Sequence, residues 1–276
     1  MTTAGKTLTR ERSFTRDAKK LLLGEGETFH GEAILAVTKA LLQSGVSYVG
    51  GYPGAPVSHL LDVLADASES VLGPYGIHFE QSASEAGAAA MLGASIHYPI
   101  RGAVTWKSIV GTNVASDALS NLASAGVVGG ALIVVGEDYG EGASVIQERT
   151  HATALKSSMP LIDPRYDMST IVDLVEKGFE LSETSHLPVL MSLRIRACHM
   201  TGSFVCKDNK PAKDLRRNAP LEPSYDYDRI VLPPSIYAQE KHKVEERLPA
   251  AVDFVRAHRL NERMGGTEKR IGIILQ

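Results

Sequence analysis

The sequence predicts an α/β fold in which a doubly wound, mainly parallel sheet is followed by a C-terminal arm and a helix. Stretches with helical periodicity alternate with short apolar runs from about residue 20 to residue 200. Several of these runs, such as residues 130–135, are apolar throughout rather than at every second position. Strands of that kind are typical of parallel sheets that helices cover on both faces. Ligands of such sheets usually bind where the carboxyl ends of the strands meet.

The order of the expected elements supports this fold class. Strands are expected at residues 46–50, 76–80, 102–106, 130–135, 160–163 and 188–195. Helices are expected at residues 31–42, 57–66, 83–96, 113–124, 144–155 and 169–183. In the first helix, for example, Ile34, Val37 and Leu41 fall on one face, as in a helix that covers a core. Regular alternation of strands and helices is the pattern of a parallel sheet.

Four regions follow from the changes in composition along the chain. Residues 1–19 form a basic, polar tail, and residues 20–200 form the α/β domain. Residues 201–268 form a linker arm with little periodicity, which ends in a charged helix at residues 239–260. Residues 269–276 resemble a new strand, which either opens a following domain that is cut short or adds an edge strand to the same sheet.

The composition excludes several classes of function. The net charge is −3, so nucleic acid is not an expected partner. Cys198 and Cys206 are the only cysteines, which fits a cytoplasmic protein and excludes an iron–sulfur cluster held by this chain alone. The sequence has no apolar run of membrane-spanning length and no His-Glu-x-x-His spacing. Neither a membrane span nor a metal site is therefore expected in this chain.

The most informative segment is the rigid turn that follows the strand at residues 46–50. It reads Gly-Tyr-Pro-Gly-Ala-Pro at residues 51–56. Pro53 and Pro56 each fix φ and lack an N–H, whereas Gly54 between them can adopt backbone angles closed to other residues. Such a turn at the carboxyl end of a strand either only joins the strand to the next helix or holds backbone ready for a ligand.

A second segment, Gln-Ser-Ala-Ser-Glu-Ala-Gly-Ala-Ala-Ala at residues 81–90, carries one carboxylate on an almost bare helix. Ser82 and Glu85 have the spacing of a capping box, in which Glu85 would serve only the start of the helix. The alternative rests on the small residues around Glu85, because another chain or a flat ligand could approach such a surface closely. Glu85 could then share a proton with a ring nitrogen of that ligand.

With later motifs, these two segments resemble thiamine-diphosphate-dependent 2-oxoacid:ferredoxin oxidoreductases, in particular the α subunit of indolepyruvate:ferredoxin oxidoreductase. Residues 104–115 (Val-Thr-Trp-Lys-Ser-Ile-Val-Gly-Thr-Asn-Val-Ala) form the third matching motif. Residues 136–149, an acidic loop before a Ser-x-x-Gln-Glu sequence, form the fourth. The Leu-Pro-Val-Leu sequence at residues 187–190, which leads to Arg194 and Arg196, is similar to the end of that subunit's first domain. The resemblance covers roughly the α/β domain and, more loosely, the arm.

The resemblance implies that the α/β domain is the pyrimidine-binding domain of an oxidoreductase. Such an enzyme oxidatively decarboxylates a 2-oxoacid, here indolepyruvate or another aryl pyruvate, to an acyl-coenzyme A and passes the electrons to iron–sulfur clusters and a ferredoxin-type carrier. Glu85 is the implied catalytic residue, because it would hydrogen-bond the aminopyrimidine ring of thiamine diphosphate. Tyr52, Pro53 and Gly54 are implied to border the cofactor. The cofactor performs the organic chemistry, while the protein supplies geometry and electrostatics.

The substrate-binding residues expected from this resemblance are Ala55, Pro56, Lys107, Asn113, Gln147 and Arg149. Family members commonly have threonine or serine at the position of Ala55, so a hydroxyl contact to the substrate is missing here or comes from elsewhere. Pyruvate-specific members carry an arginine where this chain has Gly136-Glu137-Asp138. Lys107, at a strand end, is therefore the candidate for binding the substrate carboxylate, with an ordinary surface lysine as the alternative. For the last two residues of the set, a salt bridge within the loop is the alternative.

The sequence lacks the Gly-Asp-Gly motif that, with a later asparagine, holds magnesium and the diphosphate in such enzymes. The isolated chain is therefore expected to be inactive and to share thiamine diphosphate with a pyrophosphate-binding domain or subunit that also holds Mg²⁺, in a dimer or larger complex. Iron–sulfur clusters and coenzyme A would come through partners or further domains. Two other interpretations stay open: part of another thiamine-diphosphate enzyme, such as a decarboxylase or synthase, and a non-catalytic assembly module whose alanine-rich helix packs on a partner.

Overall fold

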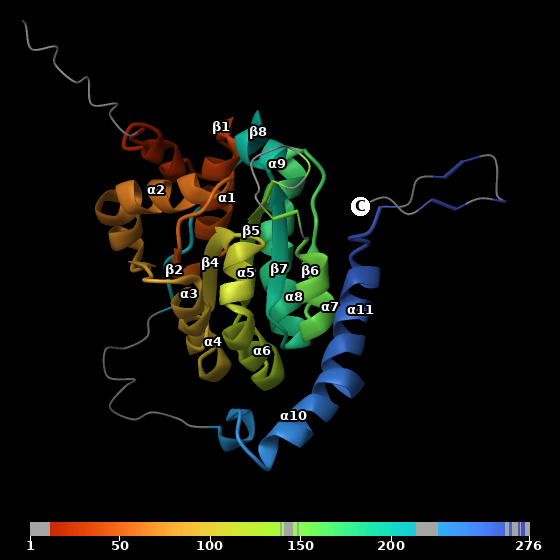
Figure 1. Ribbon diagram of the computed structural model, residues 1–276. Helices are drawn as coiled ribbons and strands as arrows, with labels where there is room; N and C mark the ends of the chain where they lie inside the picture. The colour runs from red at the N-terminus through yellow and green to blue at the C-terminus, as the bar shows by residue number, and fades with distance from the viewer. Residues whose placement is uncertain are drawn as a thin grey trace, which may run out of the picture.

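Six parallel strands form the central sheet, in the order β3-β2-β4-β5-β7-β6 (Figure 1). The computed structural model describes residues 12–138, 140, 146–147, 149–213, 226–262, 265–266, 270 and 272–273. The strands of the central sheet are β2 (Val46–Gly51), β3 (His78–Gln81), β4 (Arg101–Lys107), β5 (Ala131–Glu137), β6 (Leu161–Ile162) and β7 (Val189–Arg194). Two further strands, β1 (Thr28–Glu32) and β8 (Thr201–Val205), pair antiparallel in a small separate sheet.

Helices connect the strands and cover the sheet. Those of the first half are η1 (Asp17–Leu22), α1 (Ala33–Gln43), α2 (Ser58–Ala67), η2 (Ser68–Leu72), η3 (Gly73–Tyr75), α3 (Glu85–Met91), α4 (Ala94–His97), α5 (Val110–Val114) and α6 (Ser116–Ala125). Those of the second half are α7 (His151–Ser157), α8 (Met168–Ser185), α9 (Ile195–His199), η5 (Tyr227–Arg229), α10 (Ser235–His242), η6 (Lys243–Arg247) and α11 (Leu248–Ala257).

Each face of the sheet has its own apolar core. Side chains alternate along a strand, so Leu132 and Val134 of β5 pack in the first core, while Ile133 and Val135 pack in the second. Helices α1, α2 and α8 line the first core, whereas α3, α6 and α7 contribute to the second. In Figure 1, α3, α5 and α6 lie in front of the sheet. The predicted doubly wound, mainly parallel α/β fold is confirmed.

Three of the helices expected in the α/β domain are divided or differ from the expected bounds by more than two residues. The helix expected at residues 83–96 is divided into α3 and α4, with Gly93, a weak helix former, between them. The helix expected at 113–124 begins at α5 and is also in two parts. Of the helix expected at 144–155, the described part contains α7, and the residue before it, Thr150, donates its backbone N–H to Glu137 at 2.5 Å.

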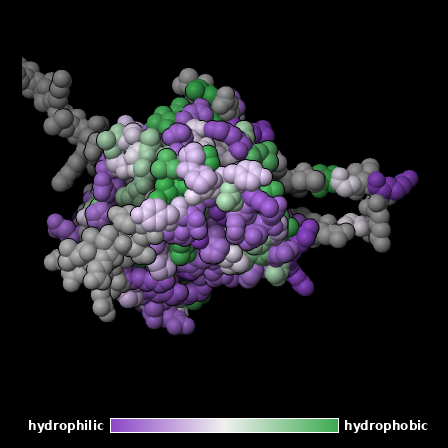
Figure 2. All heavy atoms as spheres, turned by 90° about the horizontal axis from the view of Figure 1, so that it is seen from below, coloured by the Kyte–Doolittle hydropathy of each residue, from purple (hydrophilic) through white to green (hydrophobic). Residues whose placement is uncertain are grey.

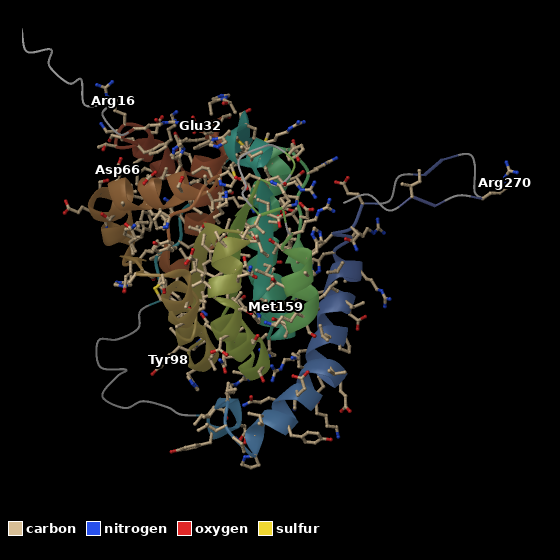
Figure 3. All side chains as sticks on the ribbon, viewed as in Figure 1. Arg16, Glu32, Asp66, Tyr98, Met159 and Arg270 are labelled. Atoms are coloured by element: carbon tan, nitrogen blue, oxygen red, sulfur yellow. The ribbon has the colours of Figure 1, made fainter. Side chains whose placement is uncertain are left out.

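The small sheet of β1 and β8 was not predicted from the sequence, since both strands lie outside the regular alternation. It holds the first residues of the arm against the α/β domain, and the register pairs Phe29 with Phe204. The chain before β1 is fastened nearby: the N–H of Phe14 donates to Asp66 at 2.6 Å, and Arg12 pairs with Glu32 at 2.6 Å. In Figure 3, the labelled side chains of Asp66 and Glu32 lie at the end of the molecule toward which the strands run.

The arm is docked on the α/β domain at several points. Asn209 accepts a hydrogen bond from the buried Lys39 at 2.5 Å, and the helices α10, η6 and α11 follow one another from Ser235, four residues before the expected start. Arg247 donates to the Ser124 carbonyl at 2.9 Å, at the end of α6, where a cation is favourable. Most of the segment at 269–276, expected to be a strand, lies outside the described residues.

The opposite end of the molecule, seen from below in Figure 2, presents mostly hydrophilic residues with only scattered hydrophobic ones. Within the described ranges, no helix combines the length and the apolar character that a membrane crossing requires.

Tyr48 of β2 makes alkaline stability a test of this fold. Burial raises its pKa to about 12, and its hydroxyl lies 2.6 Å from that of Ser95. A tyrosine in the unfolded chain ionises near pH 10. The folded state therefore holds the phenol proton more tightly, so this contribution to stability is complete below about pH 10 and is lost as the pH rises through about 12.

We expect Tyr48→Phe to flatten the fall in unfolding free energy between about pH 9 and about pH 12, measured by urea denaturation. Tyr237→Phe, at an exposed position of α10, serves as the control and should keep the wild-type slope. An unchanged slope in the Tyr48 variant would show that this phenol is not the group responsible.

Candidate functional site

The carboxyl ends of β2, β4 and β5 meet at one end of the molecule. The rigid turn at residues 52–56 lies across the ends of β4 and β5. A Cβ placed on Gly54 would lie only 2.5 Å from the Cβ of Lys107. A Cβ placed on Gly136 would lie 2.8 Å from Cδ of Pro56. Glycine is required at both contacts, because a side chain there would push the turn off the strand ends. The turn therefore packs over the carboxyl ends of β4 and β5, the edge at which sheets of this kind usually bind ligands.

Lys107 and Asp138 form an ion pair beside this turn. The Nζ of Lys107 lies 2.7 Å from Oδ2 of Asp138, whose side chain is 1% exposed, whereas that of Lys107 is 18% exposed. The second oxygen, Oδ1, is buried and has no hydrogen-bond partner among the described residues. Lys107 is thus not an ordinary surface lysine, because a buried carboxylate holds its ammonium at the edge of the site.

Glu85 is the first residue of α3, and the residue that caps this helix is Ser84 rather than Ser82. The Ser84 hydroxyl accepts the N–H of Gly87 at 3.3 Å. The predicted capping box of Ser82 and Glu85 is wrong, because the helix begins two residues later than that motif requires. Glu85 therefore does not occupy the position from which a capping-box glutamate reaches back to the N-cap amide.

The Glu85 side chain reaches into a closely packed space over α5. Glu85 is only 9% exposed, and no hydrogen bond or ion pair to its carboxylate occurs within the described part of the chain. A Cβ placed on Gly111 would lie 3.0 Å from Oε1 of Glu85 and 2.6 Å from Cδ1 of the fully buried Trp106. Neither of its oxygens is among the fully enclosed polar atoms that lack a partner, so the carboxylate stays accessible at the surface of this packed space. This carboxylate is therefore suited to receive an N–H from a ligand.

The close packing at Gly111 predicts a large effect for a single methyl group. Gly111→Ala would bring the new Cβ into Trp106 and Glu85, so we expect a loss of about 1–3 kcal/mol of unfolding free energy from overpacking. Urea denaturation measures this loss. The control is Gly87→Ala on the exposed side of α3, where a Cβ would meet only ordinary contacts of 3.7 Å and more. Equal stability of both variants would contradict the packing around Glu85.

The other predicted site residues lie at different depths. Ala55 is exposed in the turn, Pro56 is buried, and Asn113 is exposed on α5. Gln147 and Arg149 are exposed between β5 and α7, in a segment several residues of which lie outside the described part. The Gln147 side chain accepts the N–H of Gly140 at 2.6 Å. The structure thus brings the turn to Lys107 and brings Glu85 to α5.

The prediction of site residues missed a buried polar cluster beside Trp106. The Ser108 hydroxyl shares hydrogen bonds with the hydroxyls of Thr112 and Thr150, and Glu137 accepts the backbone N–H of Thr150. The sequence signal for this cluster was Glu137-Asp138 at the end of an apolar strand. Two acidic side chains at a sheet edge need hydrogen-bond donors or cations when they are buried. Among the described residues, no three histidine, cysteine, aspartate or glutamate side chains are grouped so as to hold a metal ion.

Comparison with known proteins agrees with the resemblance inferred from the motifs. No protein-family model matches the chain. The indolepyruvate oxidoreductase subunit IorA of Methanothermobacter thermautotrophicus is 31% identical over 167 residues, which are 60% of this chain and 26% of that protein. The chain is similar to IorA. The IorA of Methanothermobacter marburgensis is 30% identical over 187 residues, 67% of this chain and 29% of the relative. The Pyrococcus horikoshii IorA is 28% identical over 180 residues, 63% of this chain and 27% of the relative.

The chain thus spans between a quarter and a third of the length of the IorA relatives that it matches. Among solved structures, it resembles a 2-oxoglutarate:ferredoxin oxidoreductase from Magnetococcus marinus with a TM-score of 0.63 and 16% identity. That likeness covers 82% of this chain and 45% of the solved one, and it supports the fold. The predicted resemblance to 2-oxoacid:ferredoxin oxidoreductases, and to IorA in particular, is confirmed.

Proposed function

We propose that this chain is the pyrimidine-binding portion of an oxidoreductase that oxidatively decarboxylates a 2-oxoacid, with aryl pyruvates such as indolepyruvate as the substrate class. The observation that carries the proposal is Glu85, a buried carboxylate without a described partner on a helix of small residues. The similarity to IorA supports the class of reaction and of substrate. Residues 20–200 would form this portion, and the arm at 201–268 would connect it to the rest of the enzyme.

The residues around Glu85 fit the aminopyrimidine ring of thiamine diphosphate. The ring is flat, and the exposed Ala83, Gly87 and Ala90 leave a surface that a flat group can approach. Its nitrogens would meet the unpartnered carboxylate of Glu85, which can accept an N–H or share a proton. When bound, the cofactor supplies the electron sink that allows a 2-oxoacid to lose carbon dioxide. In this proposal Tyr52, Pro53 and Gly54 border the ring.

Lys107 would bind the carboxylate of the 2-oxoacid. An ammonium has three N–H donors, so Lys107 can keep its bond to Asp138 and still donate to a substrate oxygen. Ala55 and Pro56 would supply an apolar rim without a hydroxyl, which suits an aryl side chain. Asn113, Gln147 and Arg149 complete the proposed set of residues that line the substrate. Asp138 orients the ammonium from the side that the substrate does not occupy.

A second domain or chain would hold Mg²⁺ and the diphosphate, and the assembled enzyme would be a dimer or larger. The exposed Val110 and Val114 of α5 and Leu155 of α7 belong to helices on the same side of the sheet as α3, and they would contact this partner. Iron–sulfur clusters, coenzyme A and a ferredoxin-type carrier would act through partners. In this proposal the isolated chain is inactive, and the compartment is the cytoplasm, where unpaired cysteines such as the buried Cys198 and Cys206 persist.

The test is reconstitution with the polypeptide that carries a Gly-Asp-Gly motif. The assembled protein should retain thiamine diphosphate and reduce a low-potential dye in the presence of coenzyme A and indolepyruvate. Phenylpyruvate, pyruvate and 2-oxoglutarate serve as comparison substrates, because they separate aryl from small and acidic side chains. Assembly without thiamine dependence would favour the assembly module, and thiamine-dependent release of carbon dioxide without dye reduction would favour a decarboxylase.

A further inference from the structure

Trp106 and Glu85 both pack against Gly111, so the position of one limits the space open to the other. Cδ1 of the indole and Oε1 of Glu85 both lie within 3.0 Å of the position that a Gly111 Cβ would take. Trp106 itself is completely buried at the end of β4. Because protein interiors are closely packed, a rotation of the indole against Gly111 would change the space that the Glu85 side chain shares there.

A line of hydrogen-bonded hydroxyl groups holds the indole at its nitrogen. Nε1–H of Trp106 donates to Oγ1 of Thr112 at 3.3 Å. That hydroxyl lies 3.2 Å from Oγ of Ser108, which lies 2.7 Å from Oγ1 of Thr150. Indole nitrogen only donates, so the Thr112 oxygen accepts at this end and leaves its own proton for Ser108. All four side chains are buried, and a buried donor or acceptor that loses its hydrogen bond destabilises the folded state.

Glu137 terminates this line at the end of β5. Its Oε1 accepts the backbone N–H of Thr150 at 2.5 Å, and the side chain is 2% exposed. That bond sets the start of α7 and thereby the position of the Thr150 hydroxyl. The line therefore runs from the end of one strand, across the start of α7, to the indole at the end of a neighbouring strand.

We propose that Ser108, Thr112, Thr150 and Glu137 are positioning residues that hold Trp106 and, through it, orient the carboxylate of Glu85. The role of Glu85 toward a cofactor rests on the proposed function, but the coupling between the hydroxyl line and Glu85 is a property of this chain alone. Ser108 and Thr150 hydrogen-bond neither Trp106 nor Glu85 in the structure, so any effect that they have on Glu85 must pass through the line.

The experiment uses two nuclear magnetic resonance signals of the intact chain without cofactor. Trp106 is the single tryptophan, so its indole N–H gives one resonance. The carboxyl carbon of Glu85 gives the second resonance. In protein labelled at glutamate, it is assigned as the signal that disappears in Glu85→Gln. Thr112→Val should shift both resonances and speed exchange of the indole N–H by roughly tenfold, the factor that one hydrogen bond of ordinary strength represents. Ser108→Ala and Thr150→Val should also shift both resonances.

Two further variants serve as a conservative replacement and as a negative control. Thr112→Ser retains the hydroxyl and should return both resonances to nearly the wild-type positions. Thr38→Val removes a buried hydroxyl whose bond stays within α1, and it should move neither resonance. If the indole resonance shifts in the three line variants while the Glu85 carboxyl resonance does not, the line holds Trp106 only and the proposal is overturned. This result is independent of whether thiamine diphosphate binds.

Discussion

Replacing Lys107 by methionine should destabilise the folded chain by about 3–5 kcal/mol, because it leaves the charge of Asp138 buried and uncompensated. Asp138 is 1% exposed, its Oδ1 already lacks a partner among the described residues, and Lys107 is the partner of its Oδ2. Methionine has a similar length and keeps the packing against the turn. The loss is therefore expected to arise from the charge, and urea denaturation at neutral pH measures it.

A second substitution separates charge from packing. Lys107→Met combined with Asp138→Asn removes both charges and should recover most of the lost stability, since an uncharged pair has a smaller desolvation cost. Lys19→Met, at an exposed position of η1, should leave the stability nearly unchanged. If Lys107→Met alone is as stable as the wild type, the buried ion pair described here does not exist in solution.

The second large effect is expected at Glu85. In the reconstituted enzyme, Glu85→Gln should lower turnover by on the order of 10²–10⁴-fold, the range that a positioned acid–base group contributes. Glutamine keeps the size of the side chain but cannot share a proton with a ring nitrogen. The variant should keep nearly the wild-type stability, because losing the interaction of the carboxylate with the first turn of α3 is offset by the smaller desolvation cost of a neutral side chain.

The matched control for this substitution is Glu69→Gln, an exposed glutamate in η2. It changes the net charge by the same amount and should keep full activity. A Glu85 variant with normal turnover and normal thiamine dependence would remove the basis of the proposed function. A Glu85 variant that loses activity only because it unfolds would be recognised by a denaturation midpoint far below that of the control.

The fold could be predicted from the sequence because the strands of a parallel sheet are apolar on both faces. The runs of β5 and β7 are short and largely apolar, and they alternate with helical segments, which favours buried parallel strands. The small sheet of β1 and β8 could not be predicted in this way, because only Phe29 and Phe204 of these strands are buried and no alternation surrounds them. Its pairing joins segments more than 160 residues apart along the chain, which local periodicity does not report.

The candidate site was predictable only where one segment carried the information. The prolines indicated the turn at residues 52–56, and the small residues around Glu85 indicated a candidate site there. The choice of Ser84 over Ser82 as the cap depends on where α3 packs, and both serines have the chemistry of a cap. The ion pair of Lys107 with Asp138 arises because β4 and β5 are neighbours in the sheet, a fact of the fold rather than of either segment.

In the proposed function, Glu85 contacts one nitrogen of the aminopyrimidine ring, and a cycle of protein and cofactor variants tests this contact. The reconstituted enzyme is assayed with thiamine diphosphate and with two analogues in which one pyrimidine ring nitrogen is replaced by CH. We expect one analogue to slow the wild type greatly but to slow Glu85→Ala hardly further, because both changes break the same contact. If the losses from Glu85→Ala and from each analogue simply add, Glu85 does not contact the ring.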